Sequence, residues 1–284
     1  MNKLWTFGDS FTWGYGCKEV NNNESIGYQK TFKNYLDTSK LIWPELVGLK
    51  INLEVSNHAR SGATNDYTLD TILKNFVNFK QNDIVVIQIS SCGRYNFTIP
   101  KKKGLLGDVE MEIWDEIYSP NNKSPYYLHP LFANRFTKDY EDGGKLRLIT
   151  NIEHTSNPEE TDYNLILNKK KYELIRDFFA EFVSTEKYYE REIWRFIQIG
   201  NILTSLGINI CMIHLDKWPY NTEKPEYLIS SSNDGLGNEI YKKGLSIFKD
   251  TKGMIPDYHP SYSGHAYIAE KIIEYVIKKQ INHA

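Results

Sequence analysis

The chain has 284 residues, a formal net charge of −2, and 25% charged residues of both signs. A chain of this length can bury a substantial core without disulfide or metal crosslinks, and this charge balance shows no footprint for nucleic acid. Three widely spaced cysteines, Cys17, Cys92 and Cys211, form no CxxC pair and so indicate neither a disulfide framework nor a zinc site.

Strands and helices are predicted to alternate along the chain. Apolar runs predict strands at 3–7, 51–56, 83–90 and 208–215. Helical patterns fill the intervals at 31–49 (interrupted by Pro44), 64–79, 170–206 and 263–281. This order favours one α/β domain over residues 1–284, with a parallel central sheet and right-handed crossovers.

Residues 97–168 break this alternation. They contain a run of three lysines, several aromatic residues and an acidic segment, and a structureless loop of that length is uncommon in a compact domain. We interpret them as an insertion that caps the active-site edge of the sheet. The alternative is a surface excursion with no role at the site.

The amino-terminal residues show no signal peptide, because the first strand begins before an apolar h-region could fit. No apolar run is long enough to cross a bilayer. We therefore expect a protein made in the cytoplasm, with no membrane partner; a place in a phage virion, or release by lysis, stays open.

Ser10 lies where the first apolar strand meets a turn, in the segment Gly8-Asp9-Ser10-Phe11. A serine hydroxyl is a poor nucleophile unless the backbone presents it and a base takes its proton. A strand end presents side chains at the carboxyl edge of a parallel sheet. His259, just before the last predicted helix, is the candidate base, and Asp257 is the candidate for orienting it.

These segments resemble the blocks of the SGNH hydrolases, also called the GDSL esterase family. Gly8 to Phe11 is similar to the first block, residues 57–64 to the second, and Asp257, His259 and Pro260 to the last. The resemblance implies a flavodoxin-like three-layer α/β/α fold. It also implies a catalytic triad of Ser10, His259 and Asp257, in which a single residue separates Asp257 from His259 where the family usually has two.

The oxyanion hole is the part of the site that the resemblance supports least. The family pattern implies that Ser10 and Gly62 donate backbone N–H groups. The family's third donor is an asparagine in a Gly-x-Asn-Asp block, which is absent here, and Cys92 falls at its position. Ser91, Arg94 and Asn96 are the candidate replacements, although Arg94 is as readily interpreted as an ion-pair partner for the insertion.

Three other histidines have structural interpretations. His265 falls in the first turn of the last predicted helix and is expected to pack or cap there. His58 adjoins the second block near a strand end. His214 ends an apolar strand.

The sequence thus predicts a metal-independent serine esterase without a cofactor, because no nucleotide-binding loop, His-Glu-x-x-His zinc motif or Gly-x-Ser-x-Gly elbow is present. The aromatic and polar insertion favours an O-acyl substrate, such as an O-acetyl group on a carbohydrate. Two alternatives stay open: a non-catalytic glycan-binding or virion structural module on the same scaffold, and an O-acyltransferase that uses the same residues.

Overall fold

The computed structural model describes residues 2–18, 37, 39–60, 63–90, 94–100, 145–151, 185–216, 218–219, 222–229, 235–250 and 258–282. The chain forms two compact units. The first comprises Met1–Val20, Lys30–Cys92 and Tyr189–Ala284, and the second comprises Asn21–Gln29 and Gly93–Tyr188.

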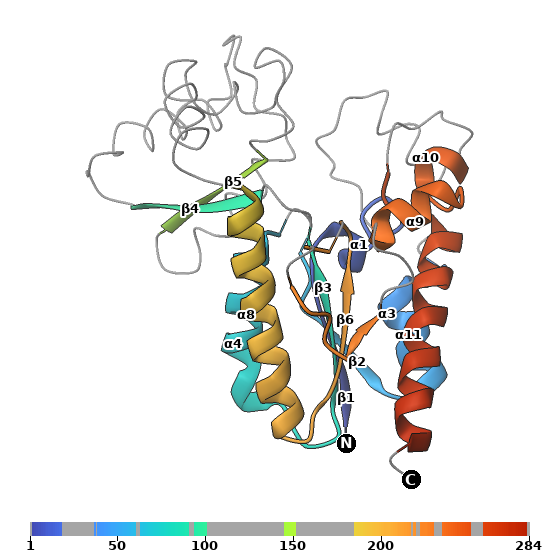
Figure 1. Ribbon diagram of the computed structural model, residues 1–284. Coiled ribbons are helices and arrows are strands. Elements are labelled where there is room, and N and C mark those ends of the chain that lie inside the picture. Colours follow the sequence, from blue (N-terminus) through green and yellow to red (C-terminus); the bar gives the residue numbers. More distant parts are fainter. Residues whose placement is uncertain are drawn as a thin grey trace. The chain divides into compact units, whose positions relative to one another are not determined.

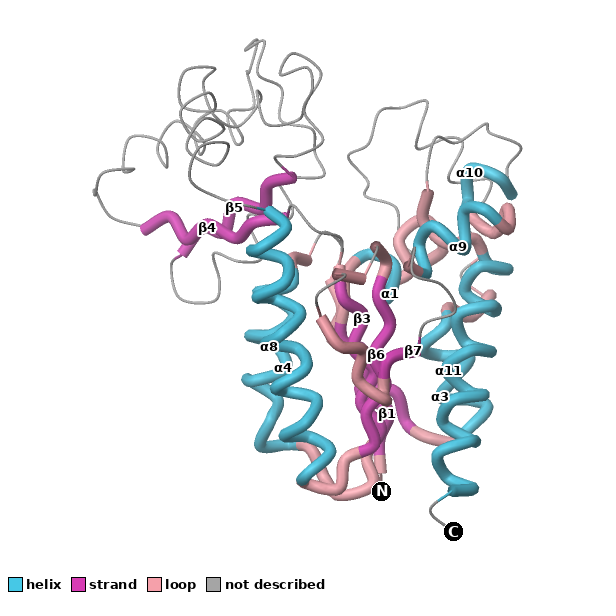
Figure 2. The backbone as a smooth tube through the Cα atoms, in the orientation of Figure 1, coloured by secondary structure: helices cyan, strands magenta, loops and turns pink. Residues whose placement is uncertain are grey.

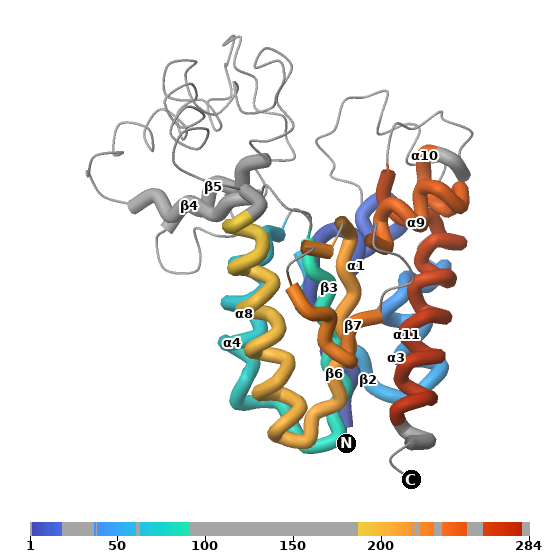
Figure 3. Tube along the Cα trace, viewed as in Figure 1, coloured from blue at the N-terminus to red at the C-terminus, as the bar shows by residue number. Residues whose placement is uncertain are grey.

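The first unit is built on a five-stranded sheet in the order β2-β1-β3-β6-β7 (Figure 2). Its strands are β1 (Lys3–Phe7), β2 (Glu54–Asn57), β3 (Ile84–Ile89), β6 (Asn209–His214) and β7 (Leu228–Ile229). Every neighbouring pair is parallel, so the carboxyl ends of the strands share one edge. The colours of Figure 3 show that β1, from the start of the chain, lies inside the sheet between later strands.

Helices cover both faces of this sheet (Figure 1). One face carries α4 (Asn65–Asn75), which continues into the 3₁₀ turn Phe76–Asn78, and α8 (Thr185–Ser205). The other face carries α3 (Trp43–Ile51), α9 (Leu236–Lys242) and α11 (Tyr262–Asn282). Two short helices, α1 (Ser10–Trp13) and α10 (Ile247–Asp250), complete the described helices of this unit. The arrangement is the predicted α/β/α fold with a parallel central sheet.

The strand sequences explain why both faces are covered. Side chains alternate between the two faces of a strand. In β3, Val85 and Ile87 pack under α4 and α8, whereas Ile84 and Val86 pack under α3 and α11. β6 alternates in the same way, and all six residues of β3 are buried. A continuous apolar run is typical of a parallel strand covered on both sides.

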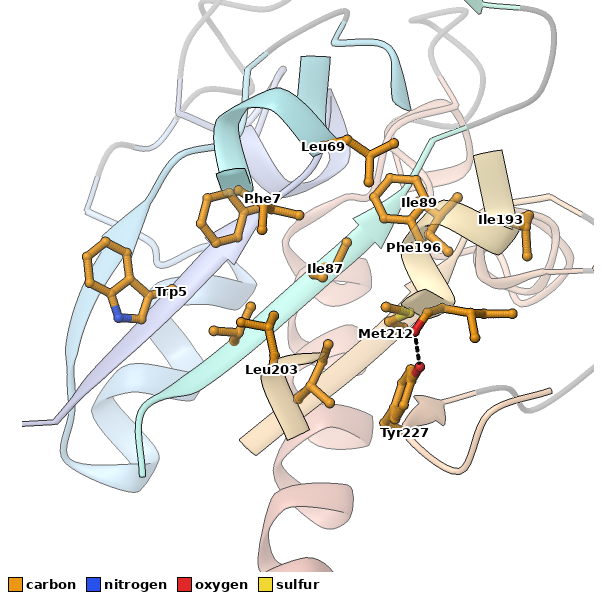
Figure 4. Packing of buried hydrophobic residues seen from close by; sticks show 14 of the residues in the cluster. Trp5, Phe7, Leu69, Ile87, Ile89, Ile193, Phe196, Leu203, Met212 and Tyr227 are labelled. Carbon is orange, nitrogen blue, oxygen red and sulfur yellow. Dashed lines mark hydrogen bonds between the residues drawn. The ribbon is translucent and has the colours of Figure 1, made fainter. Parts of the chain in front are cut away.

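The core between the sheet, α4 and α8 contains large interlocking side chains (Figure 4). Leu69 of α4 and Phe196 of α8 meet Phe7 and Ile87 of the sheet in this cluster. The hydroxyl of Tyr227 donates a hydrogen bond to the carbonyl of Ile197 at 2.8 Å, so the polar end of this buried ring is satisfied. The cluster fixes α8 against the sheet along most of its length.

The described part of the second unit is an antiparallel pair, β4 (Arg94–Pro100) and β5 (Lys145–Asn151). Arg94 lies opposite Asn151 in the register, and Asn96 lies opposite Ile149. The predicted insertion at 97–168 falls within this unit; its role as a cap stays a prediction.

Several predicted boundaries were wrong. The strand predicted to begin at Ile51 begins at Glu54, because α3 runs through Ile51 and ends at Asn52, which has a left-handed φ of 57°. Pro44 lies in the first turn of α3, where its missing N–H costs no hydrogen bond, so it begins the helix instead of interrupting it. α4 ends at Asn75, and α9 and α10 are too short for a periodic signal to predict them.

Within the described residues, no helix combines the length and apolar character needed to cross a membrane.

Two leucines of α4 test the packing of the core with a matched control. Leu69 is 1% exposed and Leu73 is 54% exposed. Leu69→Ala is expected to lower the free energy of unfolding by about 2–5 kcal/mol, because it leaves a cavity under α8. Leu73→Ala should change it by about 0.5 kcal/mol or less. Denaturant unfolding of both variants measures the difference, and equal losses would contradict this packing.

Candidate functional site

Ser10 is the first residue of α1, directly after the turn that follows β1. Asp9 caps this helix: its carboxylate accepts the N–H of Phe11 at 3.0 Å, and its carbonyl accepts the N–H groups of Thr12 and Trp13. Gly14 ends the helix with a left-handed φ of 84°. The Ser10 N–H has no acceptor among the described residues.

The side chain of Gln88 holds this turn from the neighbouring strand β3. Its Oε1 atom accepts the N–H of Asp9 at 3.0 Å and the hydroxyl of Thr12 at 2.8 Å. Gln88, Asp9 and Thr12 are all fully buried, so these hydrogen bonds replace water that the groups cannot reach. The contact fixes Ser10 at the carboxyl edge of the sheet.

His259 reaches Ser10 from the other end of the chain. Its Nε2 atom lies 2.6 Å from Ser10 Oγ, across 249 residues of sequence. The rings of Phe11 and Tyr15 flank the imidazole, with centroids 5.1 and 4.9 Å from it. A serine and a histidine in this contact can act as a nucleophile and its base.

The backbone around His259 is held by residues 245–247, which lead into the first residue of α10. The N–H of Ile247 donates to the carbonyl of His259 at 2.8 Å, and the N–H of Ser261 donates to the carbonyl of Leu245 at 2.9 Å. Gly264 lies so close to this segment that a Cβ atom there would come 2.4 Å from the Leu245 carbonyl oxygen. The histidine is therefore carried by a pinned turn ahead of α11.

The second sequence block lies beside Ser10. The N–H of Arg60 donates to the carbonyl of Gly8 at 3.1 Å. Asn57 accepts the hydroxyl of Thr6 and the N–H of Ala59, and its amide donates to the carbonyl of Thr12 at 3.2 Å. These contacts join the chain leading to Gly62 to the turn that carries the serine.

The remaining predicted site residues are not brought together by described contacts. Gly62, Ser91 and Asp257 lie outside the described residues. Arg94 and Asn96 are strand residues of β4 in the second unit. Their roles stay predictions.

The other histidines have structural partners. His265 is fully buried and its Nδ1 accepts the N–H of Trp43 at 3.4 Å; burial lowers the pKa of His265 to about 3, so it stays neutral. His58 stacks on Trp5 and Phe7, and burial lowers its pKa. His214 packs edge-on against Trp218, and burial likewise lowers its pKa.

Two buried polar residues near this edge were missed by sequence reasoning. Gln88 is a polar residue inside the apolar strand β3. Glu192 lies on the buried face of α8, three residues after Tyr189 and four before Phe196. In each case the sequence shows a polar residue at a position where the strand or helix pattern places apolar residues.

Glu192 is held by α4. Its Oε2 atom accepts the side-chain N–H of Asn65 at 2.9 Å, and it is 2% exposed. Burial raises the pKa of Glu192 to about 8, and the nearby carboxylate of Asp66 acts in the same direction. The hydrogen bond from Asn65 and the charges of Arg195 and Arg191 act against this rise. The folded protein therefore keeps this carboxyl neutral at pH 7.

A cavity of about 420 Å³ lies at the opposite edge of the sheet. It is lined by Ile84 and Asn209, the first residues of β3 and β6, and by Tyr227 and Tyr275. It is not part of the serine–histidine site. No group of three potential metal ligands gathers anywhere in the described residues.

Comparisons with known proteins return structural neighbours only. No family model matches the sequence, and no curated protein matches it. A G-D-S-L family protein from Desulfitobacterium hafniense DCB-2 is similar at 14% identity over 97% of this chain and 99% of that chain, with a TM-score of 0.30. A carbohydrate esterase whose active site displays divergent catalytic and non-catalytic binding functions is similar at 13% identity, over 97% of this chain and 68% of its own, with a TM-score of 0.36.

A substitution at Gly8 tests the contacts that Gln88 makes with the turn before Ser10. A Cβ atom at this position would lie 2.5 Å from Gln88 Oε1 and 2.6 Å from Thr12 Oγ1. Gly8→Ala is therefore expected to displace the Gln88 side chain and lower the free energy of unfolding by about 1–3 kcal/mol. Thermal unfolding measures the loss, and an unchanged midpoint would contradict the close approach.

Glu192 should make stability depend on pH. Because its pKa is higher in the folded than in the unfolded protein, the folded state binds the extra proton between about pH 4.5 and 8. The free energy of unfolding should then fall as pH rises through this window, by at most about 1.4 kcal/mol per pH unit from this one group. Glu192→Gln should remove that slope. An identical pH dependence in the variant and the parent protein would contradict this assignment.

Proposed function

We propose that this protein is a serine esterase of the SGNH type, with Ser10 as the nucleophile and His259 as its general base. The 2.6 Å contact between His259 Nε2 and Ser10 Oγ carries the proposal. It joins two residues from opposite ends of the chain, at the edge of the sheet where parallel α/β folds bind their ligands.

The contact suits acyl transfer through a covalent intermediate. His259 Nε2 accepts the proton as Ser10 Oγ attacks the ester carbonyl, and the imidazolium then protonates the leaving alcohol. A water molecule repeats the sequence on the acyl-serine, which releases the acid and restores both side chains. We assign to Asp257 the orientation of the imidazole and the stabilisation of its charged form.

The oxyanion would be bound by backbone donors. The first donor is the Ser10 N–H at the start of α1. We assign the second donor to Gly62, which follows two residues after Arg60, and the N–H of Arg60 donates a hydrogen bond to the carbonyl of Gly8. Loss of one such donor typically lowers the rate by about 10²–10³-fold. For the third donor, Ser91, Arg94 and Asn96 remain the candidates.

The proposed substrate is an O-acyl group, such as O-acetyl, on a carbohydrate. Aromatic side chains support this choice, because sugar rings stack on aromatic faces. Tyr258, next to His259, is 57% exposed and stacks on Phe248 with ring centroids 5.5 Å apart. Phe11, which contacts the imidazole, is only partly buried.

Replacing the two reacting residues tests the proposal. Ser10→Ala and His259→Ala should each lower hydrolysis of p-nitrophenyl acetate about 10³-fold or more, because the nucleophile and its base act as a unit. A fluorophosphonate should label the parent protein at Ser10, as located by mass spectrometry of the peptides. Released acetate from acetylated glycans tests the substrate class, and product analysis with an added acceptor alcohol separates hydrolysis from acyl transfer.

Ser39→Ala is the matched control, since Ser39 is exposed and its hydroxyl donates a local hydrogen bond to Asp37. It should retain full activity. Full hydrolysis by Ser10→Ala would refute the catalytic assignment.

A further inference from the structure

Two chain segments that lead to the proposed oxyanion donors are joined by the side chains of Asn65 and Ser90. Asn65 begins α4, three residues after Gly62, and Ser90 follows the last residue of β3, directly before Ser91. The Asn65 amide accepts the N–H of Ser90 at 2.8 Å and donates to its carbonyl at 3.3 Å. The Ser90 hydroxyl also donates to the carbonyl of Ala63 at 3.3 Å.

Asn65 thus pairs with Ser90 as a neighbouring strand would. Both residues are fully buried, so water cannot replace these hydrogen bonds. The Asn65 amide and the Ser90 hydroxyl both hold the distance between the two segments. Movement of that amide would shift one segment against the other.

Glu192 of α8 also contacts the Asn65 amide. Its Oε2 atom accepts the same Asn65 Nδ2 group that donates to Ser90, and its Oε1 atom has no hydrogen-bond partner among the described residues. A buried carboxyl group with an unsatisfied oxygen adds little to the stability of the folded protein, because an apolar side chain of similar volume is usually as stabilising or more so. Its presence beside the site therefore points to a role in function.

We propose that Asn65 and Glu192 are positioning residues that set the spacing of the two oxyanion-hole segments, and that only the neutral form of Glu192 holds that spacing. This inference rests on the proposed function. Neither residue is assigned a contact with substrate; both act through the backbone at Ala63 and Ser90.

The chemistry of the shared donor explains why the charge matters. A carboxylate accepts a stronger and shorter hydrogen bond than a neutral carboxyl group. Ionised Glu192 would draw Asn65 Nδ2 toward itself and away from the Ser90 carbonyl, where the bond is already long at 3.3 Å. The charged groups that face Glu192 are Asp66 on α4 and Arg191 and Arg195 on α8, and Arg195 is already paired with Asp66.

The pH profile of kcat/KM tests the charge. Burial raises the pKa of Glu192 to about 8, so activity of the parent protein should fall above that pH. Glu192→Gln keeps a neutral amide in place of the neutral acid, so it should keep the activity at pH 7 and lose the alkaline decline. The matched control is Glu190→Gln on the same helix, which should keep the decline. An unchanged alkaline decline in Glu192→Gln would overturn the inference.

Asn65→Ala tests whether the Asn65 amide holds the spacing of the two segments. It should lower kcat about 10–100-fold with a smaller change in KM, because misplaced donors weaken the transition state more than substrate binding. Parent-like kcat in a folded Asn65→Ala protein would overturn the inference.

Hydrogen exchange at the Ser90 amide gives a readout that needs no catalysis. Its protection factor should fall above about pH 8 in the parent protein and stay constant in Glu192→Gln. If the parent protein neither hydrolyses esters nor reacts with fluorophosphonate at Ser10, the proposed function fails. The exchange result still decides whether Asn65 and Glu192 hold the spacing of the two segments. Equal protection in both proteins at every pH would overturn it.

Discussion

The site depends on the buried amide of Gln88. Its Oε1 atom is the shared acceptor for the backbone of Asp9 and the hydroxyl of Thr12, on either side of the serine. Because β3 is covered on both faces and pairs with β1 and β6, this acceptor lies on a fully buried strand inside the sheet. The position of Ser10 is therefore set by the core and not by the short helix that it begins.

The sequence predicted the layers of the fold well because the pattern that makes them is local. The apolar runs of β1, β3 and β6 and the long helix α11 can each be recognised without knowing their neighbours. Their ends were predicted less well. Ile51 is as apolar as a strand residue, and only the left-handed turn at Asn52 shows that the helix continues to it.

The pairing of Ser10 with His259 was predicted only through the resemblance of three short motifs. No periodicity relates positions 249 residues apart, and the contact exists because β1 and the turn before α11 end at the same side of the sheet. Gln88 and Glu192 were missed for the opposite reason. Each stands alone in an apolar pattern, and the partners that explain it, Asp9 and Asn65, come from other elements.

Both sides of the serine–histidine contact are anchored by hydrogen bonds to the backbone. Gln88 holds the turn before Ser10, while Ile247 and Leu245 hold the carbonyl of His259 and the N–H of Ser261. Two independently fixed backbones can keep side chains at hydrogen-bond distance without ordering by a ligand, which is the preorganisation that acyl transfer requires. The third part, the spacing of Ala63 and Ser90, is held by the Ser90 hydroxyl and by the Asn65 amide, which the buried carboxyl of Glu192 contacts. A change of charge can reach the site through this third part, because Glu192 contacts Asn65 and burial raises the pKa of Glu192 to about 8.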